Sequence, residues 1–174
     1  IGYMLQPAQA YQTEIHRIRA LGMGEEAVAR ANNWARASKT AGVSMAENIE
    51  IFRDGLAIFS DARHAEMAAP VMQRMKYANE ALFGAENAAD KTRQLYDLLK
   101  VIDLRGATNN AAEFAAEADK IQRVLTSTGG RVGAQEYRDL ISRGGVAAKR
   151  MDSDAFYNVL EPMVQDMGGH SVGT

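Results

Sequence analysis

From Thr126 to Thr174 the chain reads TSTGGRVGAQEYRDLISRGGVAAKRMDSDAFYNVLEPMVQDMGGHSVGT. Three Gly-Gly pairs interrupt this stretch, at Gly129-Gly130, Gly144-Gly145 and Gly168-Gly169, and each follows a segment with helical periodicity. Glycine just after a helix adopts, at no steric cost, the left-handed conformation that ends the helix. The stretch therefore predicts short helices that are separated by glycine stops.

The composition of the rest of the chain also favours helix. The 174 residues include only three prolines, and strong helix formers such as Ala, Glu and Arg are abundant. Strand patterns of alternating β-branched residues are missing. We predict an all-α fold: a compact bundle of about eight short-to-medium helices separated by glycine and proline breaks, forming a single domain over residues 1–174.

Start and stop signals place six helices before residue 126. They are expected at about residues 7–21, 25–40, 44–59, 62–83, 90–104 and 110–125. Two more are expected at residues 135–142 and from Asp152 or Ser153 onward, the latter kinked or restarted by Pro162. Pro70 is expected to begin a new helix inside the fourth segment, because a proline in mid-helix would clash with the carbonyl of Glu66.

The third of these helices has the clearest local signature. Ser44 and Glu47 have the spacing of a capping box, in which each side chain satisfies a backbone amide near the other residue. A single buried stripe is expected behind it, at Met45, Ile49, Phe52, Leu56 and Phe59. Gly55 costs this helix about 1 kcal/mol relative to Ala, so we expect it to admit a neighbouring helix closely.

A second apolar stripe, in the fourth segment, is rich in methionine. It comprises Met67, Val71, Met72, Met75 and Leu82. Flexible thioethers suit either an adaptable partner surface or the filling of irregular gaps in a core. We favour the second interpretation.

Charge and composition limit the functions that are open to the chain. Twenty Lys and Arg stand against 22 Asp and Glu, a net charge of -2 that disfavours a nucleic-acid partner. The absence of cysteine excludes disulfides, thiolate catalysis and Cys-based zinc sites. No apolar run approaches the roughly 20 residues that span a bilayer, so no membrane contact is expected of this segment. Because the chain opens on Ile1 and stops on a glycine-rich tail, we expect it to be a fragment of a longer protein.

One stretch matches a hydrolase motif. Gly169-His170-Ser171-Val172-Gly173 has the Gly-x-Ser-x-Gly pattern of a nucleophile elbow. That motif requires a strand before the serine, a helix after it, and acid and histidine partners further along the chain. Here a predicted helix precedes the motif, and the chain ends one residue later. A hydrolase that uses Ser171 is therefore the weakest of the alternatives.

Other polar clusters have simpler explanations than chemistry. Asp61 and His64 have the spacing of ligands on one helical face, with Glu66 nearby, but no second histidine follows at that spacing. The pairs Glu25-Glu26 and Asp152 with Asp154 lie at helix starts, where the helix dipole favours carboxylates. We therefore predict no catalytic residue, no metal site, no cofactor and no small-molecule substrate.

The basic residues near the end of the chain suggest a different alternative. Residues 135–150 could form a helix-turn-helix whose phosphate contacts are Arg138, Arg143, Lys149 and Arg150. The second helix would be only about one turn long. A small helical binding or regulatory module, with DNA as one target, thus remains an alternative.

Several of these stretches together resemble a segment found in tail length tape measure proteins of bacteriophages and prophages with long tails. They are Asp103–Gly106, Ser127–Val132, Gly144–Ala148, Met167–Thr174, Phe59–Glu66 and Lys76–Phe83. The resemblance covers most of the chain from about Glu25 onward, and it carries no active-site residues.

The resemblance implies a structural, non-enzymatic component of a phage or prophage tail. Tape measure proteins set tail length as extended helical rods and help to form the channel for genome delivery. A helical rod gains about 1.5 Å per residue, whereas this chain is interrupted too often to form one, so we expect a globular domain within the longer protein. The implied partners are other tail proteins or sister copies of the chain. The implied location is the virion tail, or the host bacterial cytoplasm during assembly.

Overall fold

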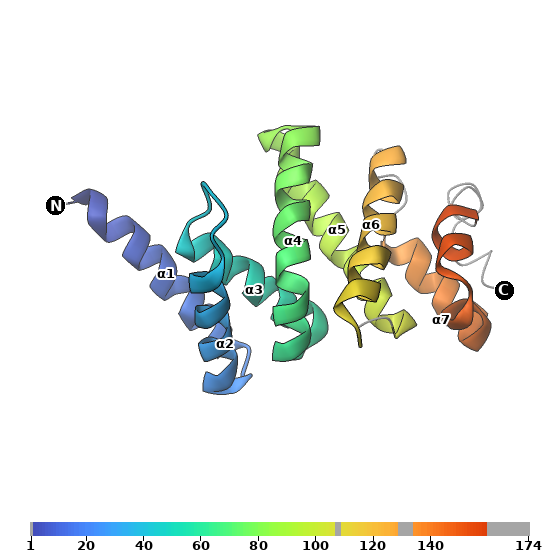
Figure 1. Ribbon diagram of the computed structural model, residues 1–174, viewed down its shortest axis with the longest axis horizontal. Helices are drawn as coiled ribbons and strands as arrows, with labels where there is room; N and C mark the ends of the chain where they lie inside the picture. The colour runs from blue at the N-terminus through green and yellow to red at the C-terminus, as the bar shows by residue number, and fades with distance from the viewer. Residues whose placement is uncertain (1, 107–108, 129–133, 160–174) are drawn as a thin grey trace. The chain divides into compact units, whose positions relative to one another are not determined.

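A computed structural model describes residues 2–106, 109–128 and 134–159 (Figure 1). All regular elements within these residues are helical, which confirms the predicted all-α fold. They are α1 (Gly2–Ala20), α2 (Gly24–Ala37), α3 (Met45–Phe59), α4 (Ala62–Phe83), α5 (Ala85–Arg105), α6 (Ala111–Ser127), α7 (Ala134–Arg150) and a single π-helical turn, η1 (Ala155–Val159).

Residue contacts divide the chain into two compact units. The first contains residues 1–73 and the second contains residues 74–174, so the division falls inside α4. The prediction of a single domain over residues 1–174 stays a prediction.

In the first unit, α3 packs against both α1 and α2. The predicted stripe of α3 is buried except at Met45, which is half-buried, and Ile49, Phe52 and Leu56 are each at most 1% exposed. The Trp34 ring on α2 lies 6.1 Å from the Phe52 ring. The capping box is also confirmed: the Ser44 hydroxyl accepts from the Glu47 amide at 3.2 Å, and the Ser44 amide donates to the Glu47 carboxylate at 2.8 Å.

The segment between α2 and α3 is held by a buried polar side chain, Gln73. Its amide group donates to Asn48 Oδ1 at 2.6 Å and to Ser38 Oγ at 3.1 Å, and it accepts from Thr40 Oγ1 at 2.8 Å. Buried polar groups need such partners, since leaving one unsatisfied costs about 1–3 kcal/mol. We predicted that the second helix extends to about residue 40, but α2 ends at Ala37. Ser38 and Thr40 instead form hydrogen bonds with Gln73.

Gly55 lies where α3 and α4 approach each other closely. A Cβ atom built on Gly55 would lie 3.2 Å from both the Cα and the Cβ of Ala65. This spacing is tighter than ordinary van der Waals contact, and the atoms in the way include backbone. The expectation that Gly55 admits a neighbouring helix is confirmed.

The prediction that Pro70 begins a new helix is wrong, because α4 runs through it from Ala62 to Phe83. Pro70 is exposed, whereas its neighbours Ala69, Val71 and Met72 are buried. Burial of those neighbours offsets the lost hydrogen bond and the strain of a mid-helix proline. Helix α1 likewise begins at Gly2, before Pro7, rather than at Pro7.

The methionine-rich stripe of α4 is only partly buried. Met72 and Met75 lie in the core, which agrees with their interpretation as core residues, and Met67 is half-buried. Leu82, which we expected on the inner side, is 59% exposed. The apolar pattern therefore predicted the middle of this helix better than its end.

In the second unit, α5 packs against α6 and α7, and α6 contacts η1. Leu95, Leu98, Leu99 and Ile102 are buried as predicted. Helix α5 begins at Ala85, directly after Gly84 with its φ of 76°, and therefore five residues before the predicted start at Asp90.

Both predicted boundaries of α6 are close to those observed. The Asn110 side chain accepts from the Ala112 amide at 2.7 Å and from the Glu113 amide at 3.4 Å, as expected of a helix N-cap. The apolar residues Phe114, Ala118 and Ile121 are fully buried.

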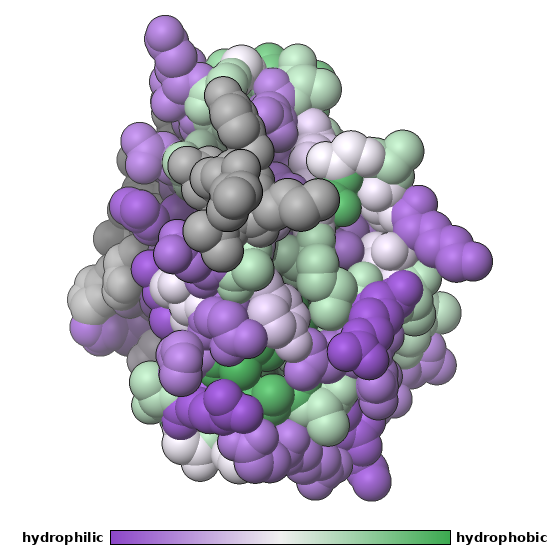
Figure 2. All heavy atoms as spheres, turned by 90° about the vertical axis from the view of Figure 1, so that its left-hand side faces the viewer, coloured by the Kyte–Doolittle hydropathy of each residue, from purple (hydrophilic) through white to green (hydrophobic). Residues whose placement is uncertain are grey.

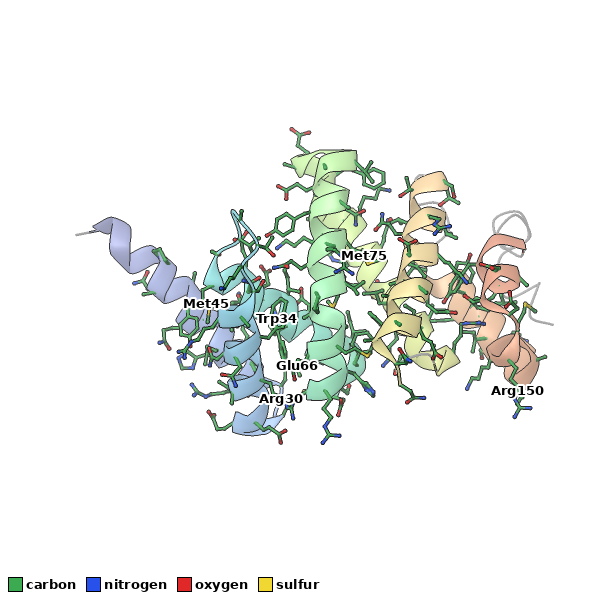
Figure 3. The ribbon with its side chains drawn as sticks, viewed as in Figure 1. Arg30, Trp34, Met45, Glu66, Met75 and Arg150 are labelled. Carbon is green, nitrogen blue, oxygen red and sulfur yellow. The ribbon has the colours of Figure 1, made fainter. Side chains whose placement is uncertain are left out.

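Hydrophilic residues cover much of the face shown in Figure 2, and hydrophobic residues appear there in smaller patches. Arg30 on α2 pairs with Glu26 at 3.0 Å and with Glu66 on α4 at 2.7 Å. Figure 3 shows the Arg30 and Glu66 side chains close together between their helices. Such partly exposed pairs contribute little to stability, because water screens them.

Substitution of Gly55 by Val tests the close approach of α3 and α4. Because the added side chain would press on the backbone of Ala65, we expect a loss of about 2 kcal/mol in the free energy of unfolding. The matched control is Ala57→Val on the exposed side of α3, which should change that free energy by about 0.5 kcal/mol or less. Urea unfolding followed by circular dichroism measures both. Equal losses for the two variants would contradict the tight contact.

Candidate functional site

Arg105 joins the end of α5 to three other segments of the second unit. Its side chain is 6% exposed, and its Nε lies 3.3 Å from the carboxylate of Glu117 on α6. The guanidinium also donates to the carbonyls of Ala148 at 3.0 Å and Met151 at 2.8 Å. A helix leaves its last carbonyls without partners inside the helix. Arg105 supplies such partners at the end of α7, from 43 and 46 residues away in the chain.

Aromatic rings complete the surroundings of the Arg105 cation. The centre of the guanidinium lies 4.2 Å from the Phe156 ring and 5.6 Å from the Tyr157 ring. A third ring, that of Tyr137, lies 5.3 Å and 5.6 Å from these two, and all three rings are fully buried. Cation–π attraction strengthens when the cation is desolvated, so the rings, Glu117 and the two carbonyls together compensate the buried charge.

Burial also changes the acidity of Tyr157. Desolvation raises the pKa of its phenol well above the ordinary value, and the nearby Glu117 carboxylate adds to the rise. Tyr157 is therefore protonated in the folded protein at neutral pH, and it acts as an apolar wall of the Arg105 cluster.

Helix α7 is broken at the Gly144-Gly145 pair. Gly145 has φ 55° and ψ −131°, a combination outside the helical region and open in practice to glycine alone. Gly144 is restricted by space instead: a Cβ there would lie 2.7 Å from the Cβ of Ala148. The predicted short helix over residues 135–142, followed by a break at Gly144-Gly145, agrees with this geometry: α7 (Ala134–Arg150) consists of two helical segments that meet at the Gly145 kink.

Beside this kink lies a hollow of about 360 Å³, which we call the α5–α7 groove. Its lining residues are Leu104, Arg138, Ile141, Ser142, Gly145, Val146 and Lys149. Ile141 is buried at 4% exposure, while Leu104 and Val146 are 36% and 64% exposed. The lining thus combines one buried and two exposed apolar side chains with the polar side chains of Arg138, Ser142 and Lys149.

The groove also carries positive charge. Arg138 lies 3.9 Å from the Asp97 carboxylate, whereas exposed Lys149 makes no ion pair with any residue in the described part of the chain. Between residues 138 and 150 the sequence has four cationic residues and one carboxylate, Asp139, in a chain whose net charge is -2. Arg150 is exposed, and in Figure 3 its side chain points away from α7.

The helix-turn-helix hypothesis placed its cations on this same segment. All four lie on α7, but Gly145 replaces the expected turn with a kink, and only residues 146–150 follow it. Arg138 and Lys149 line the groove, whereas Arg143 and Arg150 do not. The structure thus brings two of the four residues to one apolar hollow.

The cluster at the start of α4 consists of a helix cap and an ion pair. The Asp61 carboxylate accepts from the backbone amide of His64 at 2.8 Å, and this hydrogen bond lowers the pKa of Asp61. Glu66 pairs instead with Arg30. Within the residues that the structure describes, no three His, Asp or Glu side chains are grouped so that they could hold a metal ion.

The carboxylate pairs also have local partners. Glu25 binds Arg19 at 2.7 Å, and the Asp152 side chain accepts from the Asp154 amide at 2.9 Å. The candidate nucleophile Ser171, its motif at residues 169–173 and Pro162 lie outside the described residues.

Sequence reasoning missed the role of Arg105 and the existence of the groove. Two signals could have pointed to them: an arginine directly before the helix stop at Gly106, and a valine directly after Gly144-Gly145. Neither signal shows which residues come into contact, because Arg105 and the Ala148 carbonyl that it binds are more than 40 positions apart in the chain.

No protein-family model, curated protein or solved structure matches the chain. Among the described residues, none of the helices has the length and apolar character needed to cross a membrane.

Replacement of Arg105 by Met tests its role in the second unit. The variant leaves the buried Glu117 carboxylate without its cation and two helix-end carbonyls without donors, so we expect a loss of about 3–5 kcal/mol in the free energy of unfolding. The exposed control Arg150→Met should change it by about 0.5 kcal/mol or less. Urea unfolding followed by circular dichroism compares them. The double variant Arg105→Met, Glu117→Met should recover part of the loss, and no recovery would argue against the ion pair.

The raised pKa of Tyr157 predicts a loss of stability at high pH. Above the ordinary tyrosine pKa of about 10, the unfolded chain releases the phenolic proton while the folded chain keeps it, so stability falls as pH rises. Between pH 8 and pH 10.5 the wild type should lose about 0.8 kcal/mol more than Tyr157→Phe. Urea unfolding at the two pH values measures this difference, and equal losses in both proteins would show that Tyr157 ionises normally.

Proposed function

We propose that the chain is a non-enzymatic helical domain of a phage or prophage tail tape measure protein, and that it binds a partner through the α5–α7 groove. The observation that carries the proposal is a convergence of two stretches of the family resemblance. Asp103–Gly106 and Gly144–Ala148 meet in space, because Arg105 binds the Ala148 carbonyl, and Leu104 and Val146 line one hollow.

The physical basis of binding would be burial of apolar surface on a rigid frame. Exposed apolar area contributes about 25 cal/mol per Å² when a partner covers it. A backbone that is already held in place loses little entropy on binding, and the contacts of Arg105 and the Gly145 kink restrain the backbone that carries the lining residues. The partner would be another tail protein or a sister copy of the chain, during tail assembly, length determination and genome delivery.

A regulatory module that binds DNA is the second candidate, favoured by the cationic excess between residues 138 and 150. Phosphate binding releases counterions, so DNA should then be retained most strongly at low salt. Failure to retain a duplex in a gel shift at low ionic strength would exclude this candidate. A hydrolase that uses Ser171 is supported by its motif alone.

The tail assignment predicts that the chain is present in phage particles. Prophage induction in the source bacterium, purification of particles on a density gradient and immunoblotting with an antibody to this chain should give a signal in the fractions that contain tails. Deletion of its coding segment should give particles with absent or altered tails in electron micrographs. Normal tails in the deletion strain, or tailed particles without the chain, would contradict the assignment.

A further inference from the structure

The α5–α7 groove has the size and lining of a site for a few apolar side chains. Its volume of about 360 Å³ is near the lower end of the range for ligand pockets. Leu104 comes from the end of α5, while Ile141 and Val146 come from the two sides of the kink in α7. An amphipathic helix presents two or three apolar side chains along one face at this scale, and hydrophobic grooves commonly receive such helices.

The charges of the groove select among such helices. Arg138 and Lys149 both line it. Arg138 lies 3.9 Å from the Asp97 carboxylate, whereas the amino group of Lys149 has no carboxylate partner among the described residues. Complementary charge around an apolar contact favours association, whereas like charge costs energy and excludes wrong partners. A helix with acidic side chains beside its apolar face would meet these two cations, and a helix with basic ones would be repelled.

The apolar lining favours a protein partner over two other anionic partners, DNA and a lipid bilayer. A DNA backbone gains little from Leu104, Ile141 and Val146, because its phosphates bind cations and not apolar side chains. An anionic bilayer presents a broad, flat surface, so it would not fill the hollow that these residues line.

We propose that the α5–α7 groove receives an amphipathic helix of a partner protein, with acidic residues flanking its apolar face. This inference rests on the docking role proposed above and adds the chemistry of the partner. The apolar side chains of that helix cover Leu104 and Val146, and one of its carboxylates pairs with Lys149, beside Arg138.

Two designed peptides test the proposal on the full 174-residue chain. Both are amphipathic helices with the same leucine face, one flanked by glutamates and the other by lysines. In NMR titrations of the labelled protein, the glutamate peptide should shift the amide signals of Leu104, Ser142, Val146 and Lys149. It should bind at least tenfold more tightly than the lysine peptide, and added salt should reduce this preference.

Groove variants with a matched control make the test specific. Val146→Asp places a carboxylate in the apolar lining and should weaken binding of the glutamate peptide at least tenfold. Ala147→Asp adds the same charge at the next exposed position, outside the lining, and should weaken it by less than threefold. Lys149→Glu should remove most of the preference for the glutamate peptide. Circular dichroism confirms that each variant is folded.

Several results would overturn the inference: equal binding of both peptides, binding of neither, shifts confined to other surfaces, or binding of a duplex DNA in place of the peptides. Self-association of the chain through the groove, measured by sedimentation and abolished by Val146→Asp, would also overturn it. Equal binding at the groove would leave the docking role standing. If neither peptide bound while the chain was found in phage tails, the tail assignment would stand without this groove.

Discussion

A buried cation, Arg105, is the constraint on which the second unit depends. Transfer of a charge out of water costs several kcal/mol unless partners replace the lost solvent, and here the partners come from α6, the end of α7 and η1. An apolar core of similar volume could be as stable. Unlike apolar contacts, the hydrogen bonds of the guanidinium are directional, and they fix where the carbonyls of Ala148 and Met151 must lie. The position of α7 against α5, and with it the groove, follows from those hydrogen bonds.

The features that the sequence predicted correctly are local ones. The capping box at Ser44, the N-cap at Asn110 and the glycine stop at Gly106 each depend on residues a few positions apart, and all are confirmed. The errors fall where distant contacts overrule local preference. Pro70 stays inside a helix because its neighbours are buried, and α2 ends early because Gln73 binds the residues that follow it.

The groove could not be predicted for the same reason. Its residues are ordinary in the sequence, and they become a site only when Arg105 reaches carbonyls 43 and 46 residues away and Gly145 takes a positive φ. The sequence did contribute the two stretches that meet there, through the resemblance to tape measure proteins. The resemblance suggests a biological setting, and the groove suggests how the chain would act in it.

The contacts of Arg105 also restrict how this part of the chain can vary in length. Gly145 fixes the direction of the backbone at one end, and the carbonyls of Ala148 and Met151 are held at the other. Insertion of one residue between them would rotate the following helical turn by about 100°, and Arg105 would face side chains in place of carbonyls. Ala147 is exposed and outside the groove lining, so it is free to change in kind, but the number of residues in this segment is fixed. Related chains should therefore keep the spacing of this segment even where its exposed residues differ.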